Sequence, residues 1–383
     1  MRTVAVVGAS LAGLSAAREL RSQGFDGRLV IIGDEPHRPY DRPPLSKDFL
    51  LGRAEPADLA LTDDDELAEL DAEWLLGTTA TGLTPAGRAV RLDDDHEVVA
   101  DGVVIATGAR PRTLVGQGGL GGVHTLRTLD DALALRADLE AAERVVVVGA
   151  GFIGAEVASS CAARGLHVTV LEAAPKPLAA LGTEMAEACA ALHGDHGVRL
   201  LCGTGVVGLS GDHRVREVLL TDGSSVSADV VVVGVGVVPT TGWLTGSGLL
   251  VDNGIVCDPG CRTSLSTVVA VGDVANVGGV RVEHWTSATE QPRTAVRNLL
   301  AGELVESCAH VPYFWSDQYG VRIQFAGRVR PDDSVEIVEG SVADRGFLAV
   351  WRRDGVDVGV LGFNSARSFG RRRRGLTPAL NPP

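Results

Sequence analysis

Residues 4–13 read Val-Ala-Val-Val-Gly-Ala-Ser-Leu-Ala-Gly, an apolar strand that runs into a glycine-rich turn, and an amphipathic pattern continues from there to Gln23. In such a turn the first glycine makes the bend, the second lets backbone N–H groups approach a pyrophosphate, and the third packs the helix on the strand. The helix N-terminus then faces the phosphates with its positive end. Gly8 and Gly13 hold the first and third positions, and Ser10 stands where a second glycine is usual. The stretch predicts a strand–turn–helix unit that binds a dinucleotide.

A second stretch of the same kind lies at residues 145–154, Val-Val-Val-Val-Gly-Ala-Gly-Phe-Ile-Gly, and it predicts a helix that runs to Arg164. Its turn carries all three glycines, Gly149, Gly151 and Gly154. One such motif is compatible with a chance grouping of glycines. Two imply a chain that holds two dinucleotides and moves electrons between them.

Each unit also has an acidic residue where its second strand ends. Asp34 closes the strand after the first motif, with Glu35 beside it, and Glu172 closes the strand after the second. A carboxylate at this place accepts hydrogen bonds from a ribose and repels the 2′-phosphate of NADPH. Lys176 is close enough in sequence to weaken that repulsion. We therefore expect NADH as the electron donor, with NADPH less favoured.

Composition narrows the class of protein. The chain has 383 residues, of which 45% are hydrophobic and 48 are glycine, which suits two or three domains with Val-rich buried parallel strands. Its net charge of −14 disfavours binding to nucleic acid or to membrane surfaces. Met1 is followed at once by a strand, and the apolar run 230–238 is too short to span a membrane. We expect a cytoplasmic protein that is a monomer or a weak homodimer.

The cysteines indicate neither a metal site nor a redox pair near the two motifs. Cys257 and Cys261 are close in sequence, in a loop between strand-like segments, and no further ligands follow at a metal-binding spacing. We expect no metal, and we interpret the six thiols as buried or loop residues. They are Cys161, Cys189, Cys202, Cys257, Cys261 and Cys308.

Strand-like and helix-like segments alternate through the first three quarters of the chain, which predicts doubly wound α/β units. Turns are expected at Gly82 and at residues 85–87, and the polar stretch 116–122 is expected to cross between domains. A helix is predicted over residues 129–142. The strands that end at Thr107-Gly108 and at residues 230–239 have the same shape, so the two halves look like internal duplicates.

The last part of the chain has a different pattern. After a helix expected at about residues 287–300, four strand-like runs predict a small third domain with an antiparallel sheet; they are residues 321–327, 335–338, 347–351 and 356–363. Arg371–Arg374 form a short basic tail on an acidic protein. Such a tail either steers an acidic partner or is simply solvated.

These motifs in this order resemble the two-dinucleotide flavoprotein superfamily that includes glutathione reductase. Within it, residues 39–47, Pro-Tyr-Asp-Arg-Pro-Pro-Leu-Ser-Lys, and 314–319, Phe-Trp-Ser-Asp-Gln-Tyr, resemble the family of putidaredoxin, rubredoxin and dioxygenase ferredoxin reductases. The resemblance implies an α/β fold with two Rossmann-like dinucleotide-binding domains, for FAD and NAD, and a small C-terminal α+β domain. The implied boundaries are 1–110 and 241–311 for FAD, 111–240 for NAD and 312–383 for the C-terminal domain.

The resemblance also implies a function. Electrons would pass from NADH through FAD to a ferredoxin, an iron–sulfur protein that supplies a cytochrome P450 or another oxygenase. Lys47 and Glu156 would form an ion pair at the flavin, where a lysine stabilises negative charge on the reduced ring. Trp315 would either lie beside the flavin or be a core aromatic residue of the third domain.

The family's cofactor contacts carry over to two sets of residues. The residues implied for FAD are Gly8, Ser10, Leu11, Ala12, Gly13, Asp34, Glu35, Arg42, Lys47, Ala80, Thr107, Gly108, Arg127, Gly272, Asp273, Trp285 and Trp315. The residues implied for NAD are Gly149, Gly151, Phe152, Ile153, Gly154, Glu172, Gly234 and Gly236. Ser10 departs from the motif, and its side chain would either crowd the pyrophosphate or donate a hydrogen bond to it.

Two other functions remain open on the sequence. One is an NADH oxidase or disulfide reductase of the same fold, in which electrons leave through a cysteine pair near the flavin. Residues 42–47 contain no cysteine, which favours single-electron steps to a metalloprotein instead. The other is a redox-sensing binding protein that resembles apoptosis-inducing factor.

Overall fold

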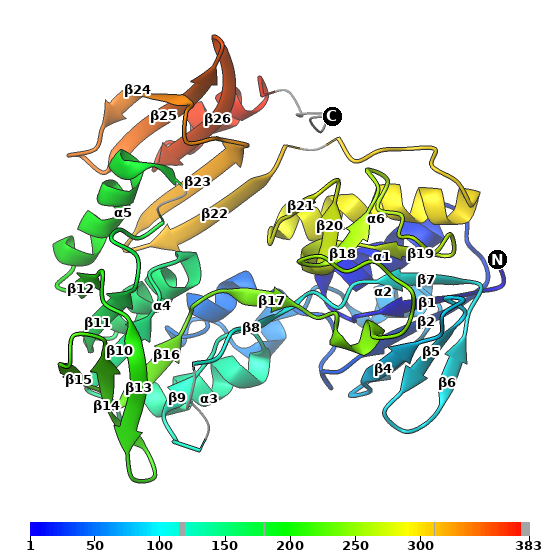
Figure 1. The fold of residues 1–383 in the computed structure, drawn as a ribbon, viewed down its shortest axis with the longest axis horizontal. Helices are drawn as coiled ribbons and strands as arrows, with labels where there is room; N and C mark the ends of the chain where they lie inside the picture. Colours follow the sequence, from blue (N-terminus) through cyan, green and yellow to red (C-terminus); the bar gives the residue numbers. More distant parts are fainter. Residues whose placement is uncertain (115–118, 179–180, 310, 377–383) are drawn as a thin grey trace.

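A computed structural model describes residues 1–114, 119–178, 181–309 and 311–376. Within these ranges the chain forms three five-stranded sheets and several smaller ones. Two of the large sheets are parallel and the third is antiparallel. Figure 1 shows the first parallel sheet on the right, the second at the lower left and the antiparallel sheet above it. The expected α/β class with a smaller C-terminal unit is confirmed.

The first sheet has the order β19-β7-β1-β2-β3 and is parallel throughout. Helices α1 and α6 pack together on one face through Leu14, Leu20, Val296 and Leu299. Two small sheets are associated with this part, β4-β5-β6 and β18-β20-β21. The bounds are β1 Thr3–Val7, α1 Leu11–Ser22, β2 Arg28–Gly33, α2 Asp64–Glu69, β3 Ala72–Leu76, β4 Ala80–Leu83, β5 Ala89–Leu92, β6 Glu97–Val99, β7 Gly102–Ile105, β18 Ile255–Cys257, β19 Val268–Ala270, β20 Ala275–Val277, β21 Val280–Arg281 and α6 Trp285–Ala301.

The second sheet repeats the plan with the order β12-β11-β10-β16-β9. Its central strands β10 and β16 are Val-rich and buried, as the inner strands of a covered parallel sheet are expected to be. Thr128 accepts a hydrogen bond from the Asp131 N–H and so begins α3 with a capping box. The bounds are β9 Val123–His124, α3 Leu129–Leu139, β10 Arg144–Val148, α4 Phe152–Ala163, β11 His167–Glu172, α5 Thr183–Asp195, β12 Arg199–Cys202, β13 Val206–Gly211, β14 Val215–Leu220, β15 Ser225–Ser227 and β16 Val230–Val233.

Two short strands connect the parallel sheets. β8 (Ala109–Pro111) and β17 (Val237–Pro239) pair antiparallel in the middle of the molecule (Figure 1). The Thr107 hydroxyl donates to the Thr240 carbonyl at 2.9 Å and ties the two crossings together. Residues 116–118 of the expected crossing at 116–122 lie outside the described residues.

The third sheet has the order β22-β23-β26-β25-β24 and is antiparallel. Helix α5 covers one face through residues such as Met185 and Leu192, although it precedes this part of the chain. Helix α7 covers the other face through Phe369. The bounds are β22 Tyr313–Gln318, β23 Val321–Gly327, β24 Ser334–Ser341, β25 Gly346–Arg353, β26 Val356–Phe363 and α7 Ala366–Arg373.

Three local predictions were wrong. Gly82 lies in β4, not in a turn, because a Cβ there would meet the Arg91 guanidinium at 2.5 Å and glycine permits this close cross-strand approach. The third sheet has a fifth strand, β22, which the sequence pattern missed. Arg371–Arg373 end helix α7, where cations suit the negative end of the helix dipole, so the arginine run is not a tail.

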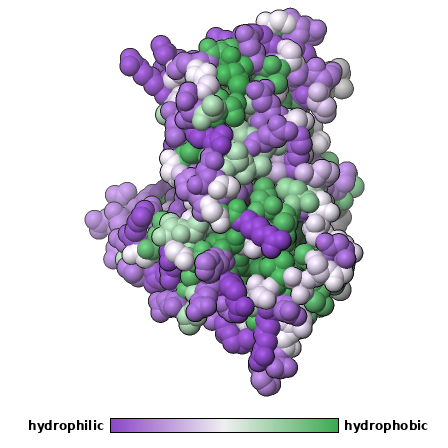
Figure 2. Space-filling view, turned by 90° about the vertical axis from the view of Figure 1, so that its left-hand side faces the viewer, coloured by the Kyte–Doolittle hydropathy of each residue, from purple (hydrophilic) through white to green (hydrophobic). Residues whose placement is uncertain are grey.

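The surface has no dominant apolar face on the side that Figure 2 shows. Hydrophobic side chains gather there in separate areas of the upper and lower parts, with hydrophilic side chains around them. Among the described residues, no helix combines the length and the apolar character that a membrane crossing requires.

Candidate functional site

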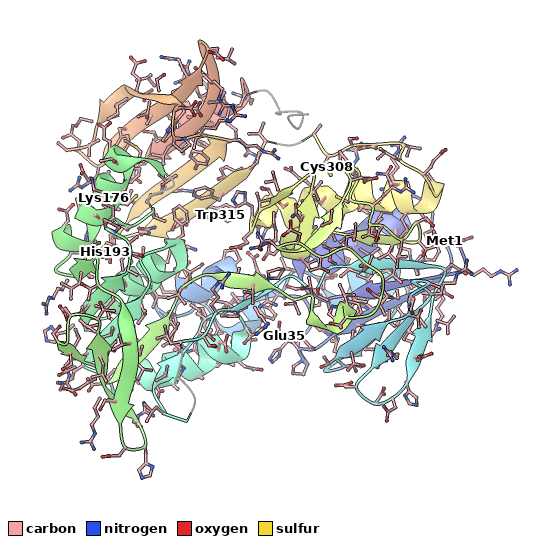
Figure 3. All side chains as sticks on the ribbon, viewed as in Figure 1. Met1, Glu35, Lys176, His193, Cys308 and Trp315 are labelled. Atoms are coloured by element: carbon pink, nitrogen blue, oxygen red, sulfur yellow. The ribbon has the colours of Figure 1, made fainter. Side chains whose placement is uncertain are left out.

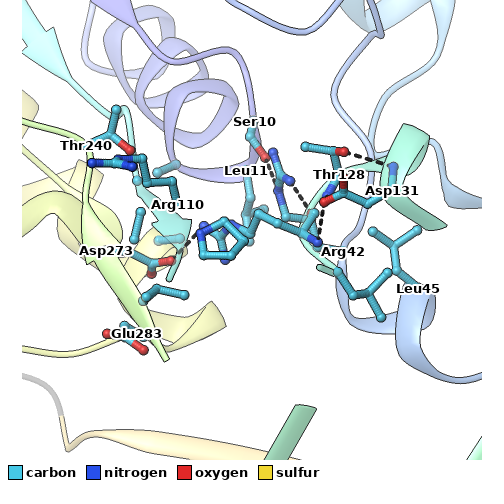
Figure 4. A pocket seen from close by; sticks show the side chains of 18 of the residues that line it. Ser10, Leu11, Arg42, Leu45, Arg110, Thr128, Asp131, Thr240, Asp273 and Glu283 are labelled. Carbon is cyan, nitrogen blue, oxygen red and sulfur yellow. Dashed lines mark hydrogen bonds and ion pairs between the residues drawn. The ribbon is translucent and has the colours of Figure 1, made fainter. Parts of the chain in front are cut away.

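A cavity of about 1060 Å³ lies where the three parts of the chain meet. Its wall takes in both glycine-rich turns, the crossing strands β8 and β17, and the start of β22. Figure 4 shows Ser10, Arg42 and Asp273 around the same space, although they come from distant parts of the sequence. The cavity is at the upper end of the size range of small-molecule sites, which suits extended ligands.

The first glycine-rich turn owes its shape to Gly8 and Gly13. Gly8 has a φ of +114°, and a Cβ there would lie 2.2 Å from the Ala106 carbonyl oxygen. A Cβ on Gly13 would lie 1.8 Å from the Gly8 carbonyl oxygen, so this glycine lets α1 sit directly on the turn. Gly13 is therefore a packing residue and does not line the cavity.

Ser10 does not strain the turn. Its φ of −96° is open to any residue, and it occupies the N-cap position of α1. Its hydroxyl makes no cap hydrogen bond and instead accepts one from Arg42 Nε at 3.3 Å. Ser10, which replaces the second glycine, therefore contacts Arg42 on the cavity wall.

In the second turn, too, the first and third glycines lie too close to backbone atoms to carry a side chain. A Cβ on Gly149 would lie 2.3 Å from the Gly234 carbonyl oxygen, and a Cβ on Gly154 would lie 2.1 Å from the Gly149 carbonyl oxygen. Gly151 differs from both, because nothing lies within 4 Å of a Cβ built there. Gly151 also lines the cavity, so its missing side chain leaves room for a ligand at the N-terminus of α4.

The acids after the two turns occupy different places. Glu172 ends β11, and its carboxylate accepts from the N–H groups of Ala150 and Ala174, each at 2.9 Å. The strand pairing aligns Glu172 with Gly33 of the first unit, so Asp34 lies one residue beyond the matching position. Asp34 is exposed and lines the cavity.

Lys176 does not reach Glu172. Its Nζ lies 2.6 Å from the Glu187 carboxylate on α5, and both side chains are exposed. Lys176 is therefore paired with Glu187 and does not neutralise the Glu172 carboxylate.

Glu35 lies on the cavity wall and contacts both Arg42 and Tyr40. Its carboxylate lies 2.6 Å from Arg42 Nη2 and accepts from the Tyr40 hydroxyl. Burial raises the pKa of Tyr40 well above its usual range, so this phenol stays protonated and donates. Arg42 Nη1 also donates to the Arg127 carbonyl at 2.5 Å. The guanidinium is fixed from several sides at the place where the first turn opens.

Arg127 and Asp273 form another ion pair on the wall of the same cavity. Arg127 Nη2 lies 2.9 Å from Asp273 Oδ2, and the Asp273 side chain is 15% exposed. Asp273 follows Gly272, whose φ is +72° and whose N–H donates to Gln291 Oε1 at 2.8 Å. Gly272 is buried and does not line the cavity, so its contribution is to fix the backbone next to Asp273.

Glu156 joins all three parts of the chain. It is 2% exposed and lies 2.8 Å from Lys47 Nζ. It also accepts from Ser46 Oγ at 2.5 Å and from Ser316 Oγ at 2.6 Å, with the Asp317 N–H at 3.3 Å. Lys47 and Ser46 belong to the part of the chain with the first sheet, and Ser316 and Asp317 belong to the part with the antiparallel sheet. Glu156 itself lies on α4, in the part with the second sheet. A buried carboxylate with this many donors is held in one orientation.

Aromatic residues form one rim of the cavity. Trp315 stacks on Tyr313 with ring centroids 5.8 Å apart and meets the edge of Trp285 at 6.1 Å. Trp285 is 37% exposed, and its Nε1 donates to Asp41 Oδ1 at 2.9 Å. It is the first residue of α6, so its backbone N–H has no partner within the helix. Figure 3 shows Trp315 facing the space between the parts of the molecule.

The structure brings most of the expected site residues to one cavity. Those on its wall are Gly8, Ser10, Leu11, Ala12, Asp34, Glu35, Arg42, Lys47, Ala80, Thr107, Gly108, Arg127, Asp273, Trp285 and Trp315 from the FAD set, and Gly151, Phe152, Ile153, Gly154, Gly234 and Gly236 from the NAD set. Glu156, predicted as the partner of Lys47, also lies on the wall. Gly13, Gly149, Gly272 and Glu172 lie off the wall. Sequence reasoning missed Ser46 and Ser316 as partners of Glu156, and no spacing signal points to contacts across such distances in sequence.

The residues present fit FAD as well as NADH. Arg42, Arg127 and the N-terminus of α1 supply positive charge for a diphosphate, and the open position at Gly151 leaves a second such place at α4. Asp273 and Asp34 offer acceptors for hydroxyl groups. None of the six cysteines is on the described wall, so no thiol competes for the same space.

Comparison with known proteins agrees with this arrangement. The ferredoxin reductase component of chlorobenzene dioxygenase from Cupriavidus sp. (strain PS12) is 38% identical over 96% of this chain and 90% of its own. Rhodocoxin reductase from Rhodococcus erythropolis is 38% identical over 91% of this chain and 83% of its own. The crystal structure of the covalent putidaredoxin reductase–putidaredoxin complex superposes with a TM-score of 0.93 at 34% identity, covering 99% of this chain and 94% of that chain.

Two family models cover nearly the whole sequence. One, described as reductase C-terminal, matches residues 313–382, the part that forms the antiparallel sheet and α7. The other, described as pyridine nucleotide-disulphide oxidoreductase, matches residues 2–292 and so includes both glycine-rich turns. The chain belongs to the pyridine nucleotide-disulphide oxidoreductase family.

Proposed function

We propose that this protein takes electrons from NADH, holds them on FAD and passes them to a ferredoxin that supplies a cytochrome P450 or another oxygenase. The observation that carries the proposal is the shared cavity. Both glycine-rich turns open into it, the Lys47–Glu156 pair lies on its wall, and no cysteine does so in the described chain. The names of the relatives, ferredoxin reductase components of oxygenase systems, point the same way.

The chain supplies binding and orientation. FAD, when bound, accepts a hydride from NADH and releases the two electrons singly. We assign the first turn, Arg42, Arg127 and Asp273 to FAD, and the second turn with Glu172 to NADH. Lys47 would hold positive charge near the flavin, and Glu156 would keep that lysine in place through its buried ion pair. We also propose the domain boundaries stated above: 1–110 with 241–311 for FAD, 111–240 for NAD and 312–383 for the C-terminal domain.

The absence of a thiol on the described wall favours transfer of the electrons to a separate protein, not to a cysteine pair of this chain. A disulfide reductase needs a cysteine pair at the flavin, and the stretch from Arg42 to Lys47 has none. Trp285 and Trp315 meet edge to face, both line the cavity, and both are partly exposed. Arg373 lies 4.1 Å over the Tyr313 ring and Arg322 lies 5.9 Å over the Trp315 ring. An acidic iron–sulfur protein suits a rim of aromatic and cationic side chains.

NADH is the donor that the geometry supports. Glu172 presents a carboxylate at the end of β11, and Lys176 is turned away toward Glu187. A 2′-phosphate would meet an unneutralised negative charge there.

A cytoplasmic location remains a prediction, which cell fractionation tests.

The experiment is an NADH-driven reduction of cytochrome c with the purified, FAD-loaded protein. We expect fast reduction when a ferredoxin is added and slow reduction without it. Treatment with a thiol-blocking reagent should leave the rate within about twofold, because no cysteine touches the cavity wall in the described chain. Fast ferredoxin-independent turnover, or loss of turnover on thiol blocking, would favour an oxidase or a disulfide reductase instead.

A further inference from the structure

Two cysteines that are distant in sequence meet in the first part of the fold. Cys261 follows β18 and Cys308 follows α6, and their sulfur atoms lie 3.4 Å apart. Both thiols are free. The sequence suggested Cys257 and Cys261 as neighbours, but Cys257 belongs to β18 and the close partner of Cys261 is Cys308. Figure 3 shows Cys308 near α6, in the connection toward the antiparallel sheet.

The backbone holds this pair in register. The Cys308 N–H donates to the Pro259 carbonyl at 2.8 Å. Asn298, fully buried on α6, accepts from the N–H groups of Val305 and Glu306 and donates to the Gly260 carbonyl at 2.9 Å. The two chain segments are therefore fixed against each other. A disulfide requires a sulfur–sulfur distance of about 2.05 Å, so side-chain rotation has to close about 1.4 Å.

The two thiols differ in access and acidity. Cys261 is fully buried, whereas Cys308 is partly exposed. The hydrogen bond from the Cys261 thiol lowers the pKa of Cys308, and the same bond, together with burial, raises the pKa of Cys261. A thiolate that is reachable from solvent and has a resolving thiol beside it is the arrangement that peroxide-sensitive pairs require.

The other cysteines lack these features. Burial raises the pKa of Cys161, Cys189 and Cys257 to about 12, so their thiols are protonated and inert at neutral pH. Cys202 is half-buried, and burial raises its pKa too. Within the described chain, Cys261 and Cys308 are set apart by contact, access and acidity together.

We propose that Cys261 and Cys308 form a reversible dithiol–disulfide site that is oxidised by hydrogen peroxide. The Cys308 thiolate attacks one peroxide oxygen, the O–O bond breaks, and a sulfenic acid and hydroxide form. The Cys261 thiol then attacks the sulfenic sulfur, the S–S bond forms, the S–O bond breaks, and hydroxide leaves. The protons of the two thiols convert both hydroxides to water. Two thiols lose two electrons in total, and one peroxide becomes two waters.

The bond would close a loop that contains functional residues. The segment between the two cysteines includes β19, Asp273 and the whole of α6 with Trp285. Cross-linking such a loop restricts the unfolded chain and stabilises the folded state. Neither cysteine lines the cavity, so the bond is expected to stabilise the site without altering it. The inference is independent of the proposed electron acceptor.

The test treats the native, FAD-loaded protein with a small excess of hydrogen peroxide, blocks free thiols and maps the peptides by mass spectrometry. We expect a peptide pair joined through Cys261 and Cys308, four remaining free thiols and full return to six after a thiol reductant. The melting temperature should rise by at least about 2 °C on oxidation and fall back on reduction. NADH-to-dye turnover should stay within about twofold.

Matched variants define the site. Cys257→Ser removes the neighbouring buried thiol and should leave the joined peptides unchanged, whereas Cys308→Ser should abolish them. Peroxide treatment that leaves all six thiols free, that joins a different pair, or that carries Cys308 to sulfinic acid without a disulfide would overturn the proposal. Because the wild-type protein supplies the main result, a variant that fails to fold does not decide the outcome.

Discussion

Replacing Glu156 by Gln tests the junction on which the site rests. Glu156 is buried and contacts Lys47, Ser46 and Ser316 from two other parts of the fold. An amide keeps the shape but removes the negative charge, so Lys47, whose side chain is 18% exposed, loses its counter-ion. The amide N–H₂ also faces hydroxyl or ammonium donors, which leaves at least one hydrogen bond unmade.

The expected cost follows from burial. Removing one partner of a fully buried ion pair costs about 3–5 kcal/mol, and the partial exposure of Lys47 reduces this to about 2–4 kcal/mol. A matched control is Glu187→Gln, which breaks the exposed pair with Lys176 and should cost about 0–1 kcal/mol. Both changes remove one negative charge, so the net charge of the two variants is the same.

The assay is urea denaturation of the FAD-loaded protein, followed by tryptophan fluorescence, together with the rate of flavin reduction by NADH. Glu156→Gln should lower the unfolding midpoint clearly and slow flavin reduction, and Glu187→Gln should do neither. Ser316→Ala should fall between them, since it removes one hydrogen bond to a charged group, worth about 1.5–3 kcal/mol. Equal midpoints for Glu156→Gln and Glu187→Gln would refute the reasoning.

Three further predictions concern cofactor choice, docking and pH. Glu172→Ala should weaken NADH binding about tenfold to a hundredfold and narrow the preference over NADPH, as steady-state KM values for both donors would show; a natural preference for NADPH contradicts the assignment. Arg373→Gln should slow ferredoxin reduction at low salt while NADH-to-ferricyanide transfer stays unchanged, and an unaltered ferredoxin rate returns Arg373 to a packing role on Tyr313. Burial lowers the pKa of His193 from 6.5 to about 4, so the unfolded chain binds a proton that the folded protein does not, and stability should fall as the pH drops from about 6.5 toward 4. His193→Gln should reduce this loss, which melting temperatures at pH 7.5 and pH 5 measure, and an unchanged difference contradicts it.

The sequence predicted those features that local patterns encode. Gly8, Gly13, Gly149 and Gly154 mark turns where a Cβ would collide with backbone, so their spacing alone locates the two units. The helices that follow end within a residue of the predicted ends. These are short-range constraints, which leave a direct trace in the order of residues.

Contacts that depend on the whole fold left no such trace. Ser316 reaches Glu156, Cys308 reaches Cys261 and Lys176 turns to Glu187 because separate sheets and helices pack together. The arginines of α7 looked like a tail because Phe369 alone marks the buried side of that short helix. A helix whose apolar face is one residue wide cannot be told from a charged loop by its pattern.

The most direct test of the central claim is a single-turnover experiment without oxygen. The FAD-loaded protein is mixed with a limiting amount of NADH and an excess of a [2Fe–2S] ferredoxin, and the flavin and cluster absorbances are followed separately. We expect flavin reduction first and then two ferredoxins reduced for each NADH consumed, since a hydride carries two electrons and each cluster accepts one. Flavin that is reduced by NADH but leaves the ferredoxin oxidised would contradict it.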